Sequence, residues 1–149
     1  MKIINQIEPI ISRDDRNAVK KYIDSGRWIT ENKLSKKFEK NFSSLVKSRY
    51  SILYPNGTLT LLSIILALGI KNKDEVIVPN YTMVATANSV ILAGAKPILC
   101  DISKENLCLD PVELKKKITN KTKAVIYVTL NGRSGSIEEI KRICKKKKI

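Results

Sequence analysis

The strand–turn–helix pattern around Gly57 constrains the fold of this chain more than any other feature of its sequence. A short apolar run at residues 50–54 leads into this turn, and a long apolar helical pattern follows at residues 58–68. A strand, a glycine turn and a helix start place unpaired main-chain N–H groups and the positive end of a helix dipole at one point, which suits a phosphate group. A second apolar strand, residues 75–78, ends at Pro79 and leads to another helix. Two such strand ends side by side form the crevice in which open α/β sheets hold their ligands.

The composition is that of an ordinary folded protein of 149 residues, with 43% apolar residues and no low-complexity segment. A chain of this length predicts one domain with a core of its own. The longest apolar stretch, residues 59–70, is interrupted by Thr60 and Ser63 and is shorter than the roughly 20 residues that cross a bilayer. The N-terminus lacks the hydrophobic block of a secretory signal. These features predict a soluble, cytoplasmic protein.

The cysteine and histidine content excludes several kinds of site. Cys100, Cys108 and Cys144 are odd in number and widely spaced, with no CxxC motif, and the chain contains no histidine. A zinc site is therefore not expected, and the thiols are expected to be reduced and partly buried. The lack of histidine also excludes Ser-His-Asp and Cys-His catalysis within this chain.

The net charge of +14 raises the question of a nucleic-acid partner, because 28 Lys and Arg stand against 14 Asp and Glu. The basic residues are spread along the chain, and the aromatic residues do not interleave with them as a stacking platform requires. We therefore favour solvated helix faces first and attraction of an anionic substrate second. A basic nucleic-acid-binding domain stays an alternative, which a salt-dependent shift with random DNA would support.

Apolar periodicity predicts helices that alternate with short, continuously apolar strands. Parallel strands covered by helices on both faces produce this pattern, so the predicted fold is α/β, with three α/β/α layers and a mostly parallel sheet. The alternation breaks off at residue 149, where a further strand is expected, so residues 1–149 are expected to be part of a larger domain. The predicted helices are residues 14–24, 33–46, 58–68, 84–92, 111–118 and 136–147; the predicted strands are residues 50–54, 75–78, 96–100 and 124–128, with a short extra strand at 106–109.

Several segments, in order, resemble the DegT/DnrJ/EryC/StrS group of sugar aminotransferases, which are fold-type I enzymes that use pyridoxal 5'-phosphate. The likeness covers nearly the whole chain, through SGRWIT, KKFEKNF, NGTLTLL, ALGIKNKDEVIVP, YTMVATANSVILAGAKPILCDI and NKTKAVIYVTLNGRSGSIEEI. NGRSG and YTMVATAN are most similar to members that make nucleotide-linked 4-amino-4,6-dideoxyhexoses such as perosamine. The resemblance implies that residues 1–149 form the N-terminal part of the aminotransferase large domain.

The resemblance implies cofactor-binding roles at matching positions. Gly57, Thr58 and the backbone of Leu59 correspond to the turn that holds the cofactor phosphate, in agreement with the interpretation from the residues themselves. An ordinary helix start is the alternative for Gly57-Thr58. Met83 falls where many relatives place an aromatic ring against the pyridine face of the cofactor. A thioether can pack on a ring with less contact area, and a plain packing role is the alternative.

The resemblance also implies substrate-binding roles. Trp28 and Thr30 lie in a segment that borders the sugar in relatives, and Asn131 and Arg133 follow the last predicted strand and are expected to face the same crevice. For Trp28 the alternative is a packing anchor, and for Arg133 an ordinary surface position. No residue of this chain is assigned a catalytic role, and no metal site is expected.

Two residues that carry the chemistry in relatives have no matching position in this chain. Relatives continue to an acidic residue that pairs with the pyridine nitrogen and to a lysine that bonds covalently to the cofactor, on which the electron-sink chemistry depends. The expected function is transamination of a nucleotide-linked keto-sugar in surface-polysaccharide biosynthesis, carried out by a complete enzyme. This chain alone is expected to be inactive.

The partners implied by the resemblance are a nucleotide-sugar substrate, an amino-acid donor, and either a second copy in a homodimer or a complementing C-terminal polypeptide. No nucleic-acid or membrane partner is expected. Two other functions stay open on the same fold. One is that of a sugar-nucleotide 3-dehydratase relative, for which the deciding residue would lie beyond residue 149. The other is that of a non-catalytic subunit from a truncated or split gene.

Overall fold

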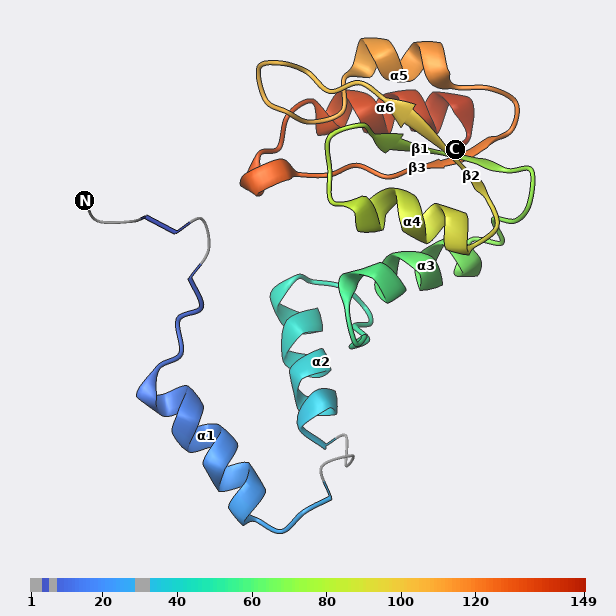
Figure 1. The fold of residues 1–149 in the computed structure, drawn as a ribbon. Helices are drawn as coiled ribbons and strands as arrows, with labels where there is room; N and C mark the ends of the chain where they lie inside the picture. Colours follow the sequence, from blue (N-terminus) through green and yellow to red (C-terminus); the bar gives the residue numbers. More distant parts are fainter. Residues whose placement is uncertain (1–3, 6–7, 29–32) are drawn as a thin grey trace. The chain divides into compact units, whose positions relative to one another are not determined.

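The computed structural model of the chain describes residues 4–5, 8–28 and 33–149. The chain divides into two compact units, Met1–Leu53 and Tyr54–Ile149. The described part of the first unit contains two helices, and the second unit contains a parallel sheet with helices (Figure 1). The sheet with its covering helices therefore lies within the second unit, and the prediction of one domain stays a prediction.

The first unit contains helix α1 (Arg13–Asp24) and helix α2 (Lys33–Leu45). Ser12 caps the start of α1: its Oγ accepts a hydrogen bond from the Asp15 N–H at 3.1 Å, and the Asp15 carboxylate accepts one from the Ser12 N–H at 2.8 Å. Hydrogen bonds from the side chain and the main chain of Ser12 lower the pKa of Asp15. Neither helix has a buried residue, so the apolar stripes of both helices are exposed.

The strand predicted at residues 50–54 is wrong. These residues pair with no strand in the described part of the chain. A strand depends on ladder hydrogen bonds with a neighbour and is not stable by itself. Here the N–H of Leu53 instead donates to the carboxylate of Glu39 on α2, at 2.8 Å.

The second unit is built on strands β1 (Glu75–Pro79), β2 (Lys96–Cys100) and β3 (Thr122–Val125) in the order β2-β1-β3. Both pairings are parallel, as predicted. All five residues of the central strand β1 are buried. The ladder of β3 begins earlier and ends earlier than predicted, although the Ile126 N–H still donates to the Ile77 carbonyl at 2.9 Å. The short strand predicted at residues 106–109 is reduced to one antiparallel bridge, between Ile102 and Leu109.

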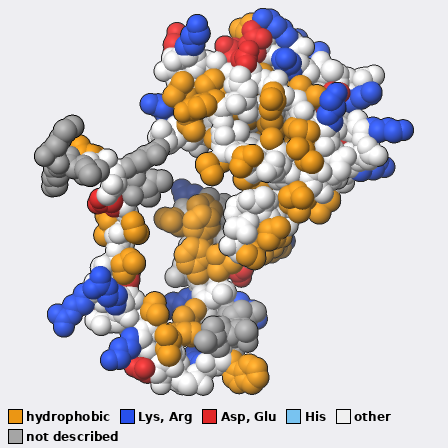
Figure 2. All heavy atoms as spheres, viewed as in Figure 1, with side chains coloured by type: hydrophobic (Ala, Val, Ile, Leu, Met, Phe, Trp, Pro, Cys, Tyr) orange, Lys and Arg blue, Asp and Glu red, His pale blue; other side chains and the backbone are white. Residues whose placement is uncertain are grey.

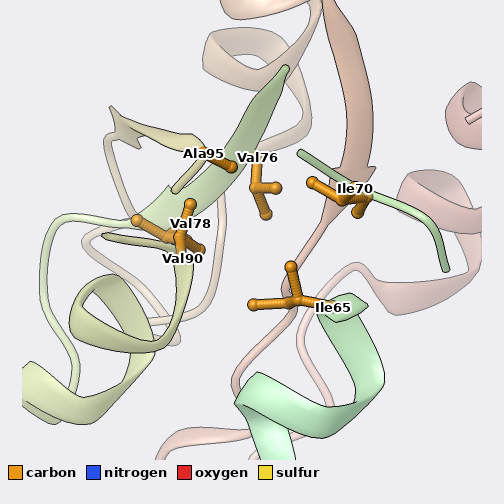
Figure 3. Packing of buried hydrophobic residues seen from close by; sticks show 6 residues of the cluster. All are labelled: Ile65, Ile70, Val76, Val78, Val90 and Ala95. Carbon is orange, nitrogen blue, oxygen red and sulfur yellow. The ribbon is translucent and has the colours of Figure 1, made fainter. Parts of the chain in front are cut away.

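Helices cover both faces of the sheet, which confirms the three-layer architecture (Figure 1). Helices α3 (Gly57–Ala67) and α4 (Val84–Leu92) lie on one face, and α5 (Pro111–Lys117) and α6 (Ile137–Lys147) lie on the other. Because side chains alternate along a strand, β1 contributes to both cores. The first core consists of Ile65, Ile70, Val76, Val78, Val90 and Ala95 (Figure 3), and the second of Ile77, Cys100, Leu109, Leu114, Ile140 and Ile143.

The sequence also determines where the helices of the second unit begin and end. Gly69 and Gly94 follow α3 and α4 with φ of 71° and 78°, the left-handed conformation that ends helices and favours glycine. Asp110 caps α5, with its carboxylate accepting from the Val112 N–H at 2.7 Å, and Pro111 occupies the first helical turn as predicted. Gly69 and Gly94 thus lead the chain from α3 and α4 into the starts of β1 and β2, and the loops that follow the strands lie at the opposite edge of the sheet.

Candidate functional site

The candidate site lies at the edge of the sheet where β1, β2 and β3 end. In Figure 1 the start of α3, the start of α4 and the turn η1 (Leu130–Gly132) lie at this same side of the second unit. Parallel α/β sheets bind their ligands at this edge, because the loops after the strands and the N-termini of the helices meet there.

The start of α3 provides a group of main-chain donors. Asn56 caps the helix: its Oδ1 accepts from the Leu59 N–H at 3.0 Å, and its carbonyl accepts from the Thr60 N–H and hydroxyl at 3.1 and 3.0 Å. Within the described residues, the N–H groups of Gly57 and Thr58 and the Thr58 hydroxyl have no hydrogen-bond partner. A Cβ added to Gly57 would meet no atom within 4 Å, so the side of the turn that a side chain would occupy is open.

This geometry refines the predicted phosphate turn. Gly57 and Thr58 keep main-chain donors available to an anion. The Leu59 N–H, which the resemblance includes, is already used by the side chain of Asn56. Asn56 itself was not predicted, although an Asn directly before a helix start is a known capping signal.

The turns after β1 and β2 are tied to each other. The Asn80 N–H donates to the Cys100 carbonyl at 2.9 Å, and the Asn80 side-chain amide donates to the carboxylate of Asp101. No local pattern predicts this pair, because its members are far apart in sequence and meet only through the parallel pairing of β1 with β2. The pair holds the segment that leads to Met83 against the neighbouring strand.

Met83 occupies the N-cap position of α4 and is 75% exposed. Its side chain is therefore available for contact with a ligand at this edge. Just beside it, the hydroxyls of Thr82 and Thr86 share a hydrogen bond of 3.0 Å, and Thr86 is buried. The start of α4 thus has two hydroxyls joined by a hydrogen bond and, next to them, an exposed thioether.

Asn131 and Arg133 lie in the loop after β3, and both are exposed. Asn131 has φ 51° and ψ 36°, within the left-handed region that Asn tolerates better than most residues. The Gly132 N–H donates to the Thr129 carbonyl at 3.0 Å, and the Arg133 N–H donates to the Leu130 carbonyl at 3.1 Å. The structure therefore brings these two predicted residues to the same edge as Gly57, Thr58 and Met83.

The other two predicted substrate residues precede the second unit in the sequence. Trp28 belongs to the first unit, is 78% exposed, and accepts a hydrogen bond on its main-chain oxygen from the Tyr22 hydroxyl at 3.3 Å. Thr30 lies outside the described residues. Their contact with a substrate stays a prediction.

Residues 4–5, 8–28 and 33–149 hold no group of three or more Cys, Asp or Glu placed to bind a metal ion. The same residues also hold no helix long and apolar enough to cross a membrane.

Comparison with known proteins identifies the family. The model of the DegT/DnrJ/EryC1/StrS aminotransferase family matches residues 9–149. The chain belongs to this family. Its three-layer fold is accordingly part of a fold-type I transferase domain, as the sequence predicted.

Among curated relatives, the chain is 35% identical to a GDP-perosamine synthase from Vibrio cholerae over 92% of its own length and 37% of the relative's. It is also 35% identical to a GDP-perosamine synthase from Escherichia coli O157:H7, over 100% of its own length and 41% of the relative's. This family member thus spans about two fifths of the length of these relatives.

Solved structures of similar sequence share the fold. An aminotransferase from Psychrobacter cryohalolentis matches with a TM-score of 0.86 at 30% identity, over 93% of this chain and 35% of its own. NtdA from Bacillus subtilis, solved with bound cofactor PMP, matches with a TM-score of 0.86 at 31% identity, over 93% of this chain and 33% of its own.

Proposed function

We propose that this chain supplies the cofactor-phosphate site and part of the sugar-nucleotide surface of a pyridoxal-phosphate-dependent aminotransferase. The proposed substrate is a nucleotide-linked keto-sugar that becomes a 4-amino-4,6-dideoxyhexose for surface-polysaccharide biosynthesis, with an amino acid as the donor. Family membership and the perosamine synthases among the relatives support this proposal. Because the match covers only part of each relative, the activity is proposed for a complete enzyme.

The observation that carries the proposal is the start of α3. Two main-chain N–H groups and one hydroxyl without a hydrogen-bond partner in the described residues lie there, at the positive end of a helix dipole. A phosphate ester is a dianion that accepts several hydrogen bonds, so Gly57 and Thr58 fit the phosphate of pyridoxal 5'-phosphate. When bound, this cofactor supplies an electron sink for moving an amino group between a donor and a keto-sugar.

Other residues of the same edge have supporting roles in this proposal. Met83 is exposed at the start of α4 and would lie against the cofactor ring through its polarizable thioether. Arg133 would pair with the diphosphate of the nucleotide sugar, since a guanidinium matches phosphate oxygens in charge and geometry. Asn131 would donate to the same substrate, and Trp28 and Thr30 would border the sugar.

A binding experiment without covalent chemistry tests the phosphate site. The many lysines of this chain would react with the aldehyde of pyridoxal phosphate, so the probes are pyridoxamine 5'-phosphate and pyridoxamine, which lack it. We expect the phosphorylated probe to bind more than about tenfold more tightly, because charge-assisted hydrogen bonds contribute about 1.5–3 kcal/mol each. Equal affinity for both probes would contradict the phosphate site.

Two variants locate the binding. Thr58→Val removes a hydroxyl that faces the proposed phosphate and should weaken binding of pyridoxamine 5'-phosphate about tenfold. Thr60→Val is the matched control, because its hydroxyl is already bonded to the Asn56 carbonyl at 3.0 Å. The proposal also requires Gly57→Asp to abolish binding, since a carboxylate there repels the dianion. Unchanged affinity in Thr58→Val and Gly57→Asp would place the phosphate elsewhere.

The proposed setting of this function is the cytoplasm, with a second copy of the chain in a homodimer or a complementing C-terminal polypeptide as partner. The active enzyme would require residues that this chain does not align with, among them the lysine that bonds to the cofactor. Co-purification with a tagged copy of the same chain, compared with co-purification of a downstream-encoded polypeptide, would distinguish the two kinds of partner.

A further inference from the structure

The loop that carries Asn131 and Arg133 is held from behind by two side chains. The Tyr127 hydroxyl donates a hydrogen bond to the Ser134 carbonyl at 2.7 Å, and the Cys108 thiol donates to the Arg133 carbonyl at 3.5 Å. Cys108 is only 1% exposed, whereas Arg133 is an exposed residue. The carbonyl of Arg133 is therefore hydrogen-bonded to a buried residue, while Arg133 itself is exposed to solvent.

Gly135 allows this close approach. A Cβ added there would lie 2.5 Å from the Tyr127 hydroxyl oxygen, 2.7 Å from the Cys108 Cβ and 3.1 Å from Asn106 Oδ1. Its φ of +49° is in the left-handed region, which other residues rarely adopt. Any side chain at residue 135 would thus both strain the backbone and push the loop away from Tyr127 and Cys108.

The loop needs such support because its backbone is unusual. Asn131, Gly132 and Gly135 all have positive φ, at 51°, 77° and 49°. Conformations of this kind cost free energy at non-glycine residues and persist where the surroundings hold them. The two short-range hydrogen bonds at Gly132 and Arg133 close the turn on itself, and the hydrogen bonds from Tyr127 and Cys108 connect it to the body of the second unit.

Both supporting residues are themselves well fixed. The Cys108 N–H donates to Asn106 Oδ1 and its carbonyl accepts from the Ser103 N–H, each at 2.9 Å, while the next residue, Leu109, is part of the second core. Tyr127 packs against that same core. Burial, with the neighbouring Cys108, raises the pKa of Tyr127 to about 12, so its hydroxyl remains a donor at neutral pH.

We infer that Cys108, Tyr127 and Gly135 form a loop lock, in which Tyr127 and Cys108 are positioning residues that set the place of Arg133 at the substrate edge. This role rests on the proposed function, because it takes Arg133 as a ligand of the substrate diphosphate. The lock itself is a property of the fold that can be measured without any ligand. The two parts therefore have separate tests.

The first test measures the lock. Tyr127→Phe removes one hydrogen bond and keeps the ring, and we expect amide hydrogen exchange in residues 130–135 to become about fivefold faster, the factor that one neutral hydrogen bond contributes. Alkylation of Cys108 by iodoacetamide should rise by a similar factor. Tyr50→Phe, at an exposed tyrosine of the first unit, is the matched control and should change neither.

Gly135→Ala is the stronger form of the same test, since its Cβ cannot be placed without moving the loop. Exchange in β1 serves as the reference in every variant. Faster exchange confined to residues 130–135 supports the lock. Unchanged exchange in both variants, or equal acceleration in β1 and the loop, overturns it.

The second test asks whether the lock acts through Arg133, with GDP as the probe for the diphosphate. Tyr127→Phe should weaken GDP binding about fivefold in the natural chain but have no further effect in an Arg133→Ala background. A purely structural role would give the same loss in both backgrounds, since independent effects add. That additive result, or no GDP binding by any variant, overturns the positioning role and counts against the proposed substrate contact, while the exchange result still decides the lock.

Discussion

The two helical layers of the second unit differ in what they present outward. Helices α3 and α4 contain no Asp, Glu, Lys or Arg, whereas more than half of the residues in α5 and α6 are charged. The outer surface of α5 and α6 carries ion pairs such as Lys115–Glu139 at 2.9 Å and Lys141–Glu138 at 2.8 Å. Figure 2 shows the same contrast, with hydrophobic side chains over α3 and charged ones over α5.

This difference teaches how each layer relates to its surroundings. An amphipathic helix with a charged outer face is stable against water, whereas a helix that is apolar all round is typical of a position covered by other protein. Leu66 and Ile91 remain more than half exposed on the α3/α4 layer in this chain. The outer face of the α5/α6 layer is therefore suited to contact with water. The outer face of the α3/α4 layer has the apolar character of an interface.

The largest effect is expected where the α5/α6 layer meets its core. Leu114 on α5 is fully buried, and Leu114→Ala should lower the free energy of unfolding of the second unit by about 2–5 kcal/mol. Val112→Ala, at an exposed position of the same helix, is the control and should change it by less than about 0.5 kcal/mol. Urea denaturation followed by circular dichroism measures both, and similar losses in the two variants would show that this core is not packed as described.

The second prediction tests the interface character of the α3/α4 layer. Leu66→Lys with Ile91→Lys should reduce self-association and binding of the dye ANS by severalfold, because the exposed apolar patch is broken by charge. The stability should change by no more than about 0.5 kcal/mol per site, since neither residue is buried. The matched change on the other layer, Val112→Lys, should leave association and dye binding nearly unaltered. An equal response from both layers would remove the contrast.

Alkaline pH should distinguish the two cores. Burial, with the neighbouring carboxylate of Asp101, raises the pKa of Cys100 to about 11, and the pKa of Tyr127 is also raised, whereas the core beneath α3 and α4 has no titratable residue. A pKa above its unfolded value means that the native state retains protons that the unfolded state releases. The stabilisation is therefore complete below about pH 9 and is lost as the pH rises through about 11.

The measurement is the urea midpoint at about pH 8 and at about pH 10.5. The urea midpoint should be lower at the higher pH. Cys100→Ala should make this decrease smaller, because it removes the group with the raised pKa. Replacement of Cys144, which is only partly buried, should reduce it less. If the midpoint does not depend on pH, the thiol of Cys100 is not held in its neutral form by the fold.

The smallest effect is expected from the surface ion pairs. Lys115 and Glu139 join α5 to α6, but both side chains are about half exposed, so Lys115→Gln should cost less than about 1 kcal/mol and less still at high salt. A double-mutant cycle with Glu139→Gln isolates the pair. A coupling energy well above about 1 kcal/mol would show that the charges of the α5/α6 layer contribute to stability as well as to solubility.

Periodicity in the sequence was sufficient to predict the helices and the three parallel strands of the second unit to within a few residues. It failed at residues 50–54 because an apolar run becomes a strand only beside a partner, and Leu53 donates to Glu39 instead. The candidate edge was predicted from Gly57 and Thr58, since a helix start has a local signature. The Asn80–Asp101 and Cys108–Arg133 hydrogen bonds were not, because each joins residues from separate loops that meet only after the sheet has formed.

The choice of Asn rather than Asp at residue 56 has an electrostatic consequence. Both residues cap helices well, and Asn56 completes the start of α3 with a neutral amide oxygen. An aspartate would satisfy the same main-chain group but would bring a negative charge next to the N–H groups of Gly57 and Thr58. The residue that caps the helix would then repel a dianion bound at the same helix start. The neutral carboxamide of Asn56 caps the helix without this repulsion.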